Sequence, residues 1–131
     1  RELAETCEIP PMVNQIELHP YCFDPDLIGY CRENGIVVEA YAPLASGAFG
    51  LLRDPVLAEI AERTGRSVGQ VILRWLVQHG CVVLPKSTNP ERMGQNRAVF
   101  DFELGEAAMR RIDGLAPKTA KRTTLDPETI V

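Results

Sequence analysis

In Val83-Leu84-Pro85-Lys86-Ser87-Thr88-Asn89-Pro90-Glu91-Arg92 a buried strand is predicted to run directly into the start of a helix. The apolar, β-branched run that Cys81 begins is typical of a core strand in a parallel sheet, and Pro85 ends it. Asn89 is a preferred N-cap residue, and Pro90 fits the first helical position, whose N–H has no partner. The stretch therefore predicts a strand, a short turn and a helix that begins at Asn89-Pro90.

The turn between this strand and this helix gathers groups that bind phosphate. Lys86, Ser87 and Thr88 lie in the turn, and Arg92 follows one turn into the helix. Cationic side chains, hydroxyls and the free N–H groups of a helix start all favour an anion. The same residues could form an ordinary solvated turn, so the stretch alone leaves both interpretations open.

Composition limits the class of protein. The chain has 131 residues, 45% of them hydrophobic, which suffices for one domain core and not for two. A net charge of −4 argues against nucleic acid or an anionic membrane as a partner. No apolar stretch approaches the ~20 residues that cross a bilayer, and the start of the chain does not read as a signal peptide. The four cysteines show neither metal-ligand spacing nor a CxxC pair, so we expect no metal site and free thiols in the cytoplasm.

One unit recurs along the chain: an apolar strand, a helix that starts at Asx-Pro, and a closing glycine. A second strand reads as covered on both faces, because Ile36-Val37-Val38 is unbroken in apolarity. Ser67 and Gln70 form a capping box for a further helix. The predicted strands are residues 12–18, 36–41 and 81–84, and the predicted helices begin near residues 25, 55, 68, 90 and 106.

The two ends of the chain read differently. Residues 2–8 look like the end of a helix whose beginning is missing, and residues 117–131 read as a polar tail or surface loop. Strands that alternate with helices predict a parallel sheet, either open or closed as a (β/α)8 barrel. Three strands cannot close a barrel, which typically needs about 250 residues. We therefore expect a portion of a larger fold.

Several stretches together resemble one family. They are Val13-Asn14-Gln15-Ile16-Glu17-Leu18-His19-Pro20-Tyr21, Glu39-Ala40-Tyr41-Ala42-Pro43-Leu44, Leu84-Pro85-Lys86-Ser87 and Arg92-Met93-Gly94-Gln95-Asn96. They resemble the aldo-keto reductases. The resemblance implies that residues 1–131 are the C-terminal portion of a (β/α)8 TIM barrel, namely its last three strand-helix units and terminal helix. The tail is similar to that of 2,5-diketogluconate reductase-like members.

The resemblance also implies an NADPH site. Gln15 matches the residue that hydrogen-bonds the nicotinamide carboxamide, and Tyr41 matches the aromatic on which the nicotinamide stacks. The loop that folds over the pyrophosphate is matched by Ala42, Pro43, Leu44 and Ser46, although the family often has a serine at the position of Ala42. The clamp on the 2′-phosphate is matched by Lys86, Ser87 and Arg92, with Thr88 beside it, and the adenine contacts by Gln95 and Asn96.

The same resemblance assigns no catalytic residue to this chain. In the family a catalytic Asp, Tyr, Lys and His come from the first half of the barrel, and all would precede Arg1. The motif of Tyr41 is that of the stacking residue, and His19, which precedes Pro20, matches a structural position at a strand end. A tyrosine of ordinary pKa ~10 needs a nearby lysine to act as an acid near neutral pH, and none is placed to help here.

We therefore predict the cofactor-binding half of an NADPH-dependent aldo-keto reductase that reduces aldehydes or ketones to alcohols. One alternative is a non-catalytic nucleotide-binding module. The other is a half barrel that pairs with a second copy or with a separate N-terminal half.

Overall fold

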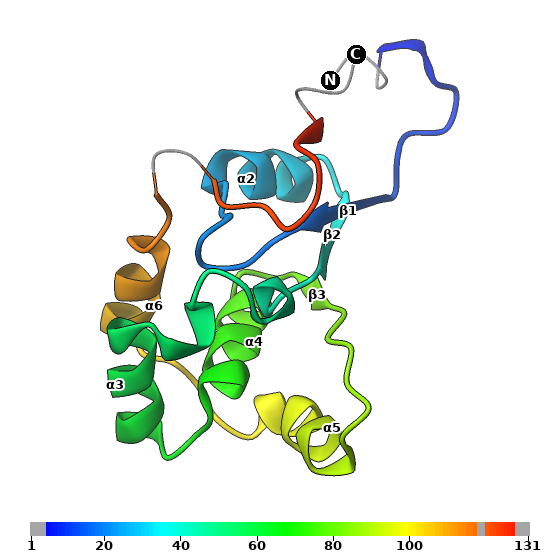
Figure 1. The fold of residues 1–131 in the computed structure, drawn as a ribbon. Helices are drawn as coiled ribbons and strands as arrows, with labels where there is room; N and C mark the ends of the chain where they lie inside the picture. Colours follow the sequence, from blue (N-terminus) through cyan, green and yellow to red (C-terminus); the bar gives the residue numbers. More distant parts are fainter. Residues whose placement is uncertain (1–4, 118–119, 128–131) are drawn as a thin grey trace.

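The computed structural model describes residues 5–117 and 120–127. Within these residues, strands β1 (Val13–Glu17), β2 (Val37–Tyr41) and β3 (Val82–Val83) form a parallel sheet in the order β1-β2-β3. The strands follow one another in the sheet as they do in the sequence, with helical segments between them (Figure 1). The predicted parallel sheet of strand-helix units is confirmed.

The helices begin where the capping residues predict. Asp24, Asp54 and Asn89 each accept a backbone N–H at the start of a helix, and each is followed by proline. Ser67 and Gln70 form the predicted capping box. The helices are α2 (Pro25–Glu33), α3 (Pro55–Thr64), α4 (Val68–Gln78), α5 (Pro90–Arg97) and α6 (Glu106–Asp113), with short 3₁₀ turns at Ala45–Gly47, Leu51–Arg53 and Ala98–Phe100.

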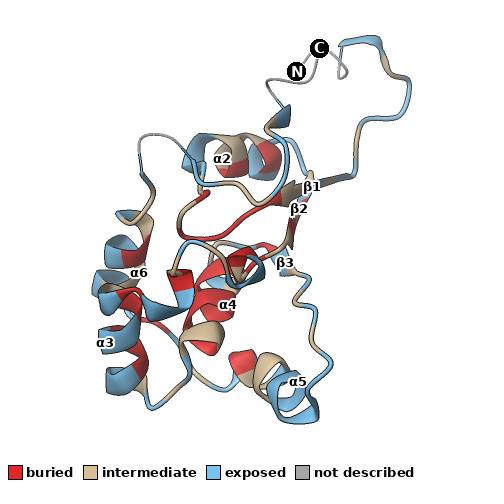
Figure 2. Ribbon diagram, viewed as in Figure 1, coloured by how far each residue is buried: buried red, intermediate tan, exposed pale blue. Residues whose placement is uncertain are grey.

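The core lies between the sheet and α4. Trp75 and Leu76 of α4 are fully buried, as are Val38 and Ala40 of β2 to within a few per cent. In Figure 2 the α4 ribbon is mostly buried, whereas α5 is mostly exposed. The helix that carries Arg92, one of the predicted phosphate-binding residues, therefore lies at the periphery and not in the core.

The other face of the sheet is open, which corrects two predictions. Val37 is 46% exposed and Val82 is 45% exposed, although β2 was predicted to be covered on both faces and β3 to be buried. Side chains alternate between faces along a strand, and only the face of Val38 and Ala40 is covered by helices. The regular part of β3 is also shorter than predicted, since Cys81 and Leu84 lie outside it.

The ends of the chain partly follow the predictions. Glu5 and Thr6 are helical, as expected for the end of a helix, and residues 1–4 lie outside the described residues. Of the predicted tail, residues 120–127 run back to the loop that follows β1, where the Lys121 N–H donates to the Tyr21 carbonyl at 2.9 Å (Figure 1). Residues 118–119 and 128–131 lie outside the described part. In the described chain, no helix has the length and apolarity that crossing a lipid bilayer requires.

Candidate functional site

Two chain segments that leave the sheet at the same edge form a cavity. The carboxyl ends of neighbouring parallel strands meet at one edge, so the segments after β2 and after β3 start side by side. Between them lies a cavity of about 510 Å³, called here the loop cavity. Its lining includes the predicted residues Ala42, Pro43, Leu44, Ser46, Lys86 and Arg92.

A second cavity adjoins the first. It measures about 400 Å³ and is called here the helix cavity, because the N-terminal turn of α4 and the α5 helix form its walls. The two cavities share Leu44, Leu52, Lys86 and Arg92. The helix cavity adds three more predicted residues, Ser87, Gln95 and Asn96. Nine of the twelve predicted residues therefore line one continuous hollow.

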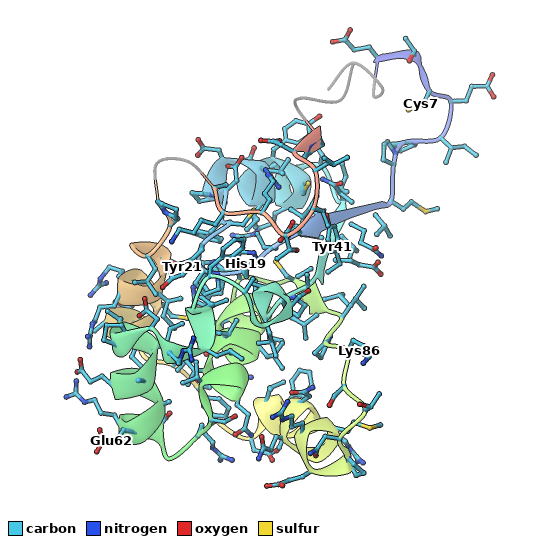
Figure 3. The ribbon with its side chains drawn as sticks, viewed as in Figure 1. Cys7, His19, Tyr21, Tyr41, Glu62 and Lys86 are labelled. Carbon is cyan, nitrogen blue, oxygen red and sulfur yellow. The ribbon has the colours of Figure 1, made fainter. Side chains whose placement is uncertain are left out.

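The hollow is electropositive. Among the described residues, neither Lys86 nor Arg92 takes part in an ion pair. Figure 3 shows Lys86 on the extended segment that leads from β3 toward α5. Asn89 already accepts the Arg92 N–H at 3.1 Å, and the Asn89 N–H donates to the Ser87 hydroxyl at 3.2 Å. An anion in the hollow would therefore be bound mainly by the Lys86 and Arg92 side chains, because the Asn89 and Arg92 N–H groups already have acceptors.

The loop that forms one wall has an unusual backbone. Ala42, Ala45, Ser46 and Phe49 all have positive φ, between 45° and 57°. Such left-handed conformations cost a non-glycine residue about 1 kcal/mol or more, and they persist where the surroundings fix them. Ala45 is fully buried and anchors the loop. Alanines give no sequence signal for this conformation, so the path of the loop was not predictable.

The remaining predicted residues lie elsewhere. Gln15 and Tyr41 line a third cavity of about 720 Å³, called here the tail cavity because Thr124, Leu125 and Pro127 form part of its wall. Gln15 donates to a Glu39 carboxylate oxygen at 2.8 Å, and the Tyr41 hydroxyl lies 2.7 Å from the Thr124 hydroxyl oxygen. Thr88 lines none of the three cavities.

Glu17, a residue that the sequence did not single out, anchors the tail. One carboxylate oxygen accepts the N–H and the hydroxyl of Thr123, both at 2.6 Å, and the other accepts the hydroxyl of Thr124 at 2.8 Å. Glu17 is 2% exposed. Burial raises the pKa of its carboxyl, but the hydrogen bonds from Thr123, Thr124 and His19 outweigh burial and lower that pKa to about 2. Glu17 is therefore an anion in the folded chain.

His19 contacts the Glu17 carboxylate and is neutral. Its side chain is fully buried, and burial lowers its pKa despite the neighbouring Glu17 carboxylate. Its Nδ1 accepts the Tyr21 N–H at 3.3 Å, so the proton is on Nε2, which lies 3.2 Å from Glu17. His19 thus occupies the structural position at the strand end that the sequence predicts.

Other residues of the site were missed. Leu52, Ser67, Val68 and Gly69 line the helix cavity, and of these only Ser67 carried a sequence signal, as a helix cap. Their approach to Arg92 depends on how α4 packs beside α5, which no local motif encodes. No group of three or more His, Cys, Asp or Glu side chains in the described part of the chain is arranged to hold a metal ion.

Comparison with known proteins settles the family. A family model described as Aldo/keto reductase family matches residues 1–117. The chain belongs to this aldo/keto reductase family. The resemblance of its motifs to this family is thereby confirmed.

Curated aldo-keto reductase relatives are similar over most of this chain. It is 48% identical to "Glyoxal reductase" of Bacillus subtilis over 114 residues, which cover 87% of this chain and 41% of that protein. It is 45% identical to "9,11-endoperoxide prostaglandin H2 reductase" of Trypanosoma cruzi over 128 residues, covering 97% of this chain and 44% of that protein. The chain thus spans less than half the length of these relatives.

Solved aldo-keto reductase structures have the same arrangement. MGS-M4, an aldo-keto reductase enzyme from a deep-sea metagenome library, matches with a TM-score of 0.91 and 40% identity over 98% of this chain and 48% of that one. A mutant of Gox0644 in complex with NADPH matches with a TM-score of 0.90 and 35% identity over 99% of this chain and 47% of that one. The family has a (β/α)8 barrel, and the three-stranded sheet described here is consistent with part of it.

Proposed function

We propose that this chain is the cofactor-binding half of an NADPH-dependent aldo-keto reductase that reduces an aldehyde or ketone to an alcohol. The observation that carries the proposal is the electropositive hollow, in which Lys86 and Arg92 face the loop that follows β2. Nine predicted cofactor residues gather there from segments about 40 positions apart in the sequence. The NADPH that is bound to the similar Gox0644 mutant supports the choice of ligand.

Each wall of the hollow suits a different part of NADPH. Lys86, Ser87 and Arg92 would hold the 2′-phosphate, because two cations and a hydroxyl match a dianion. The loop from Ala42 to Ser46 would lie against the pyrophosphate, and Gln95 and Asn96 against the adenine. NADPH supplies the hydride when it is bound. This chain binds and orients the cofactor, and the proton donor is expected from the upstream half of the barrel.

The nicotinamide end would lie at the tail cavity. Tyr41 offers an aromatic face for stacking, and the Gln15 amide can both donate to and accept from a carboxamide. Gln15 at present donates to Glu39, so binding requires its amide to exchange that partner. Tyr41 ends β2, and Gln15 lies on the same face of the sheet one residue pair nearer the middle of β1, close to the carboxyl ends of the strands, where ligands of this barrel architecture bind.

The test is nucleotide affinity in a matched pair of variants. Arg92→Met removes an exposed cation from the hollow, and Arg97→Met removes an exposed cation at the other end of the same helix, outside both cavities. Losing one charged contact to phosphate should weaken NADPH binding by about 10- to 100-fold in Arg92→Met. NADH binding should change little, and Arg97→Met should match the wild type. Equal loss of NADPH and NADH in Arg92→Met would contradict the assignment.

The open sheet face favours a second candidate, a half barrel that assembles with a second copy or a separate N-terminal half. Val13, Val37 and Val82 are each about half exposed on that face. Sedimentation velocity would test self-association, with Val37→Lys expected to yield monomers. Met93→Lys, at a somewhat more exposed apolar residue on α5, is the control and is expected to have no effect. Monomeric wild-type chain that binds NADPH would leave the reductase proposal as the better account.

The remaining expectations follow from the reductase proposal. The substrate would be a small carbonyl compound, and neither nucleic acid nor a membrane is expected as a partner. The four cysteines are free thiols, which suits a cytoplasmic protein.

A further inference from the structure

Tyr41 is held by a chain of hydrogen bonds that ends at Glu17. Glu17 and Tyr41 are direct partners in the parallel pairing of β1 with β2, so their side chains stand next to each other on the open face. Thr124 of the tail lies across this pair. Its hydroxyl is 2.8 Å from a Glu17 oxygen and 2.7 Å from the Tyr41 hydroxyl.

The direction of these hydrogen bonds is fixed by chemistry. An ionised carboxylate only accepts, so Thr124 must donate its single hydroxyl proton to Glu17. Thr124 then has only lone pairs left for Tyr41, and the Tyr41 hydroxyl must be the donor. The order is therefore Tyr41 to Thr124 to Glu17. Each bond polarises the next, which strengthens the chain as a whole.

Further contacts, which do not involve Tyr41, hold the tail in place. Thr123 donates to Glu17 through both its N–H and its hydroxyl, and Lys121 lies 4.7 Å from the centre of the Tyr21 ring. The Tyr21 hydroxyl in turn donates to Asp54, the cap of α3. The tail is thus fixed at two places, to Glu17 at the end of β1 and to Tyr21 in the loop that follows, and this places Thr124 where Tyr41 can reach it.

We propose that Glu17 and Thr124 are positioning residues that hold the Tyr41 ring in one orientation, so that the C-terminal segment of the chain sets the surface on which a nicotinamide ring stacks. This inference rests on the proposed function, in which Tyr41 receives that ring. An aromatic side chain free to turn about its side-chain bonds would have to be ordered on binding, at a cost in affinity. In this chain the folded structure already orders the Tyr41 ring, so binding does not have to.

The test separates the hydroxyl of Thr124 from the rest of its side chain. Thr124→Val keeps the shape and removes the hydroxyl, whereas Thr124→Ser keeps the hydroxyl and removes a methyl group. Thr123→Val is a matched control, because it removes a hydroxyl that reaches Glu17 and not Tyr41, while the backbone N–H of residue 123 still donates to Glu17 and holds the tail. The chain contains three tyrosines, so labelling with fluorotyrosine gives three ¹⁹F signals, of which those of Tyr21 and Tyr30 are internal references.

We expect Thr124→Val to move or broaden the Tyr41 signal and to weaken both NADPH and NADH binding by about three- to tenfold, the loss typical of one neutral hydrogen bond. The ratio of the two affinities should stay at its wild-type value, because the 2′-phosphate site is untouched. Thr124→Ser should behave as the wild type. Thr123→Val should leave the Tyr41 signal in place.

Three results would overturn the inference. An unchanged Tyr41 signal in Thr124→Val would mean that the hydroxyl does not orient the ring. A changed signal with unchanged affinity would mean that the orientation does not serve the cofactor. Equal effects of Thr124→Val and Thr124→Ser would assign the effect to packing. Wild-type chain that binds neither nucleotide would instead refute the proposed function, and the ¹⁹F signals would still decide whether Thr124 orients Tyr41.

Discussion

The acid stability of the chain should depend on Glu17. In the folded chain its pKa falls from the ordinary 4.5 to about 2, whereas in the unfolded chain the carboxyl regains its ordinary pKa. At about 1.4 kcal/mol for each pH unit, this difference contributes roughly 3 kcal/mol to the free energy of unfolding. Because the folded pKa is the lower one, the contribution is complete above pH 4.5 and is lost as the pH falls toward 2.

The perturbation is Glu17→Gln, compared with Glu62→Gln at an exposed position on α3 (Figure 3). Urea unfolding between pH 2 and pH 7 gives the free energy of each variant. We expect Glu17→Gln to be less stable than the wild type by about 2–3 kcal/mol at pH 7, since the amide presents donors to the donors of Thr123 and Thr124. The two curves should converge near pH 2. Glu62→Gln should follow the wild-type curve.

Amide hydrogen exchange locates the effect. The N–H groups of Thr123 and Thr124 donate to Glu17 and should be protected at pH 5 in the wild type and not in Glu17→Gln. Identical pH dependence of the wild type and Glu17→Gln, with equal exchange at both threonines, would refute the reasoning that Glu17 is an ionised anchor for the tail.

Two further predictions concern partly buried hydrogen bonds. Asp54→Ala should lower the free energy of unfolding by about 2 kcal/mol in urea titrations, because it removes the cap of α3 and leaves the Tyr21 hydroxyl without its acceptor; full wild-type stability would contradict this double role. Trp75→Phe should lower the free energy of unfolding, measured in the same titrations, by about 1–2 kcal/mol. The ring contacts with Phe23 are kept, while the indole N–H bond to Asp113, at 2.8 Å, is lost. A decrease above about 4 kcal/mol would indicate a packing defect instead.

Local signals account for the parts of the fold that the sequence predicts well. Asp24, Asp54 and Asn89 each place a side-chain acceptor directly before a proline, and this pairing defines a helix start without reference to the rest of the chain. The predicted cofactor residues come from motifs that are also contiguous in sequence. Nine of them lie together because β2 and β3 are neighbours in the sheet.

Long-range contacts account for what was missed. The tail has no apolar period, so nothing local indicates that Thr123 and Thr124 meet a carboxylate more than 100 positions away. Ala42 and Ala45 adopt the left-handed backbone conformation, which in sequence analysis is normally indicated by glycine. The exposure of Val37 was missed because an apolar run indicates that a strand is suited to burial. It does not indicate whether this chain covers one face of the strand or both.

The register of β1 with β2 explains why the predicted nicotinamide residues also belong to a structural network. Val13 pairs with Val37, Gln15 with Glu39, and Glu17 with Tyr41, and all six side chains share the open face. The apolar pair lies at the amino end of the strands. Gln15 donates to Glu39 at their middle, and Thr124 bridges Glu17 and Tyr41 at their carboxyl end. Glu17 is buried and needs its partners for stability, whereas water can reach Gln15 and Tyr41, whose side chains are less buried. For Gln15 and Tyr41 the partners mainly fix the position of the side chain, which is what the proposed stacking of a flat ligand requires.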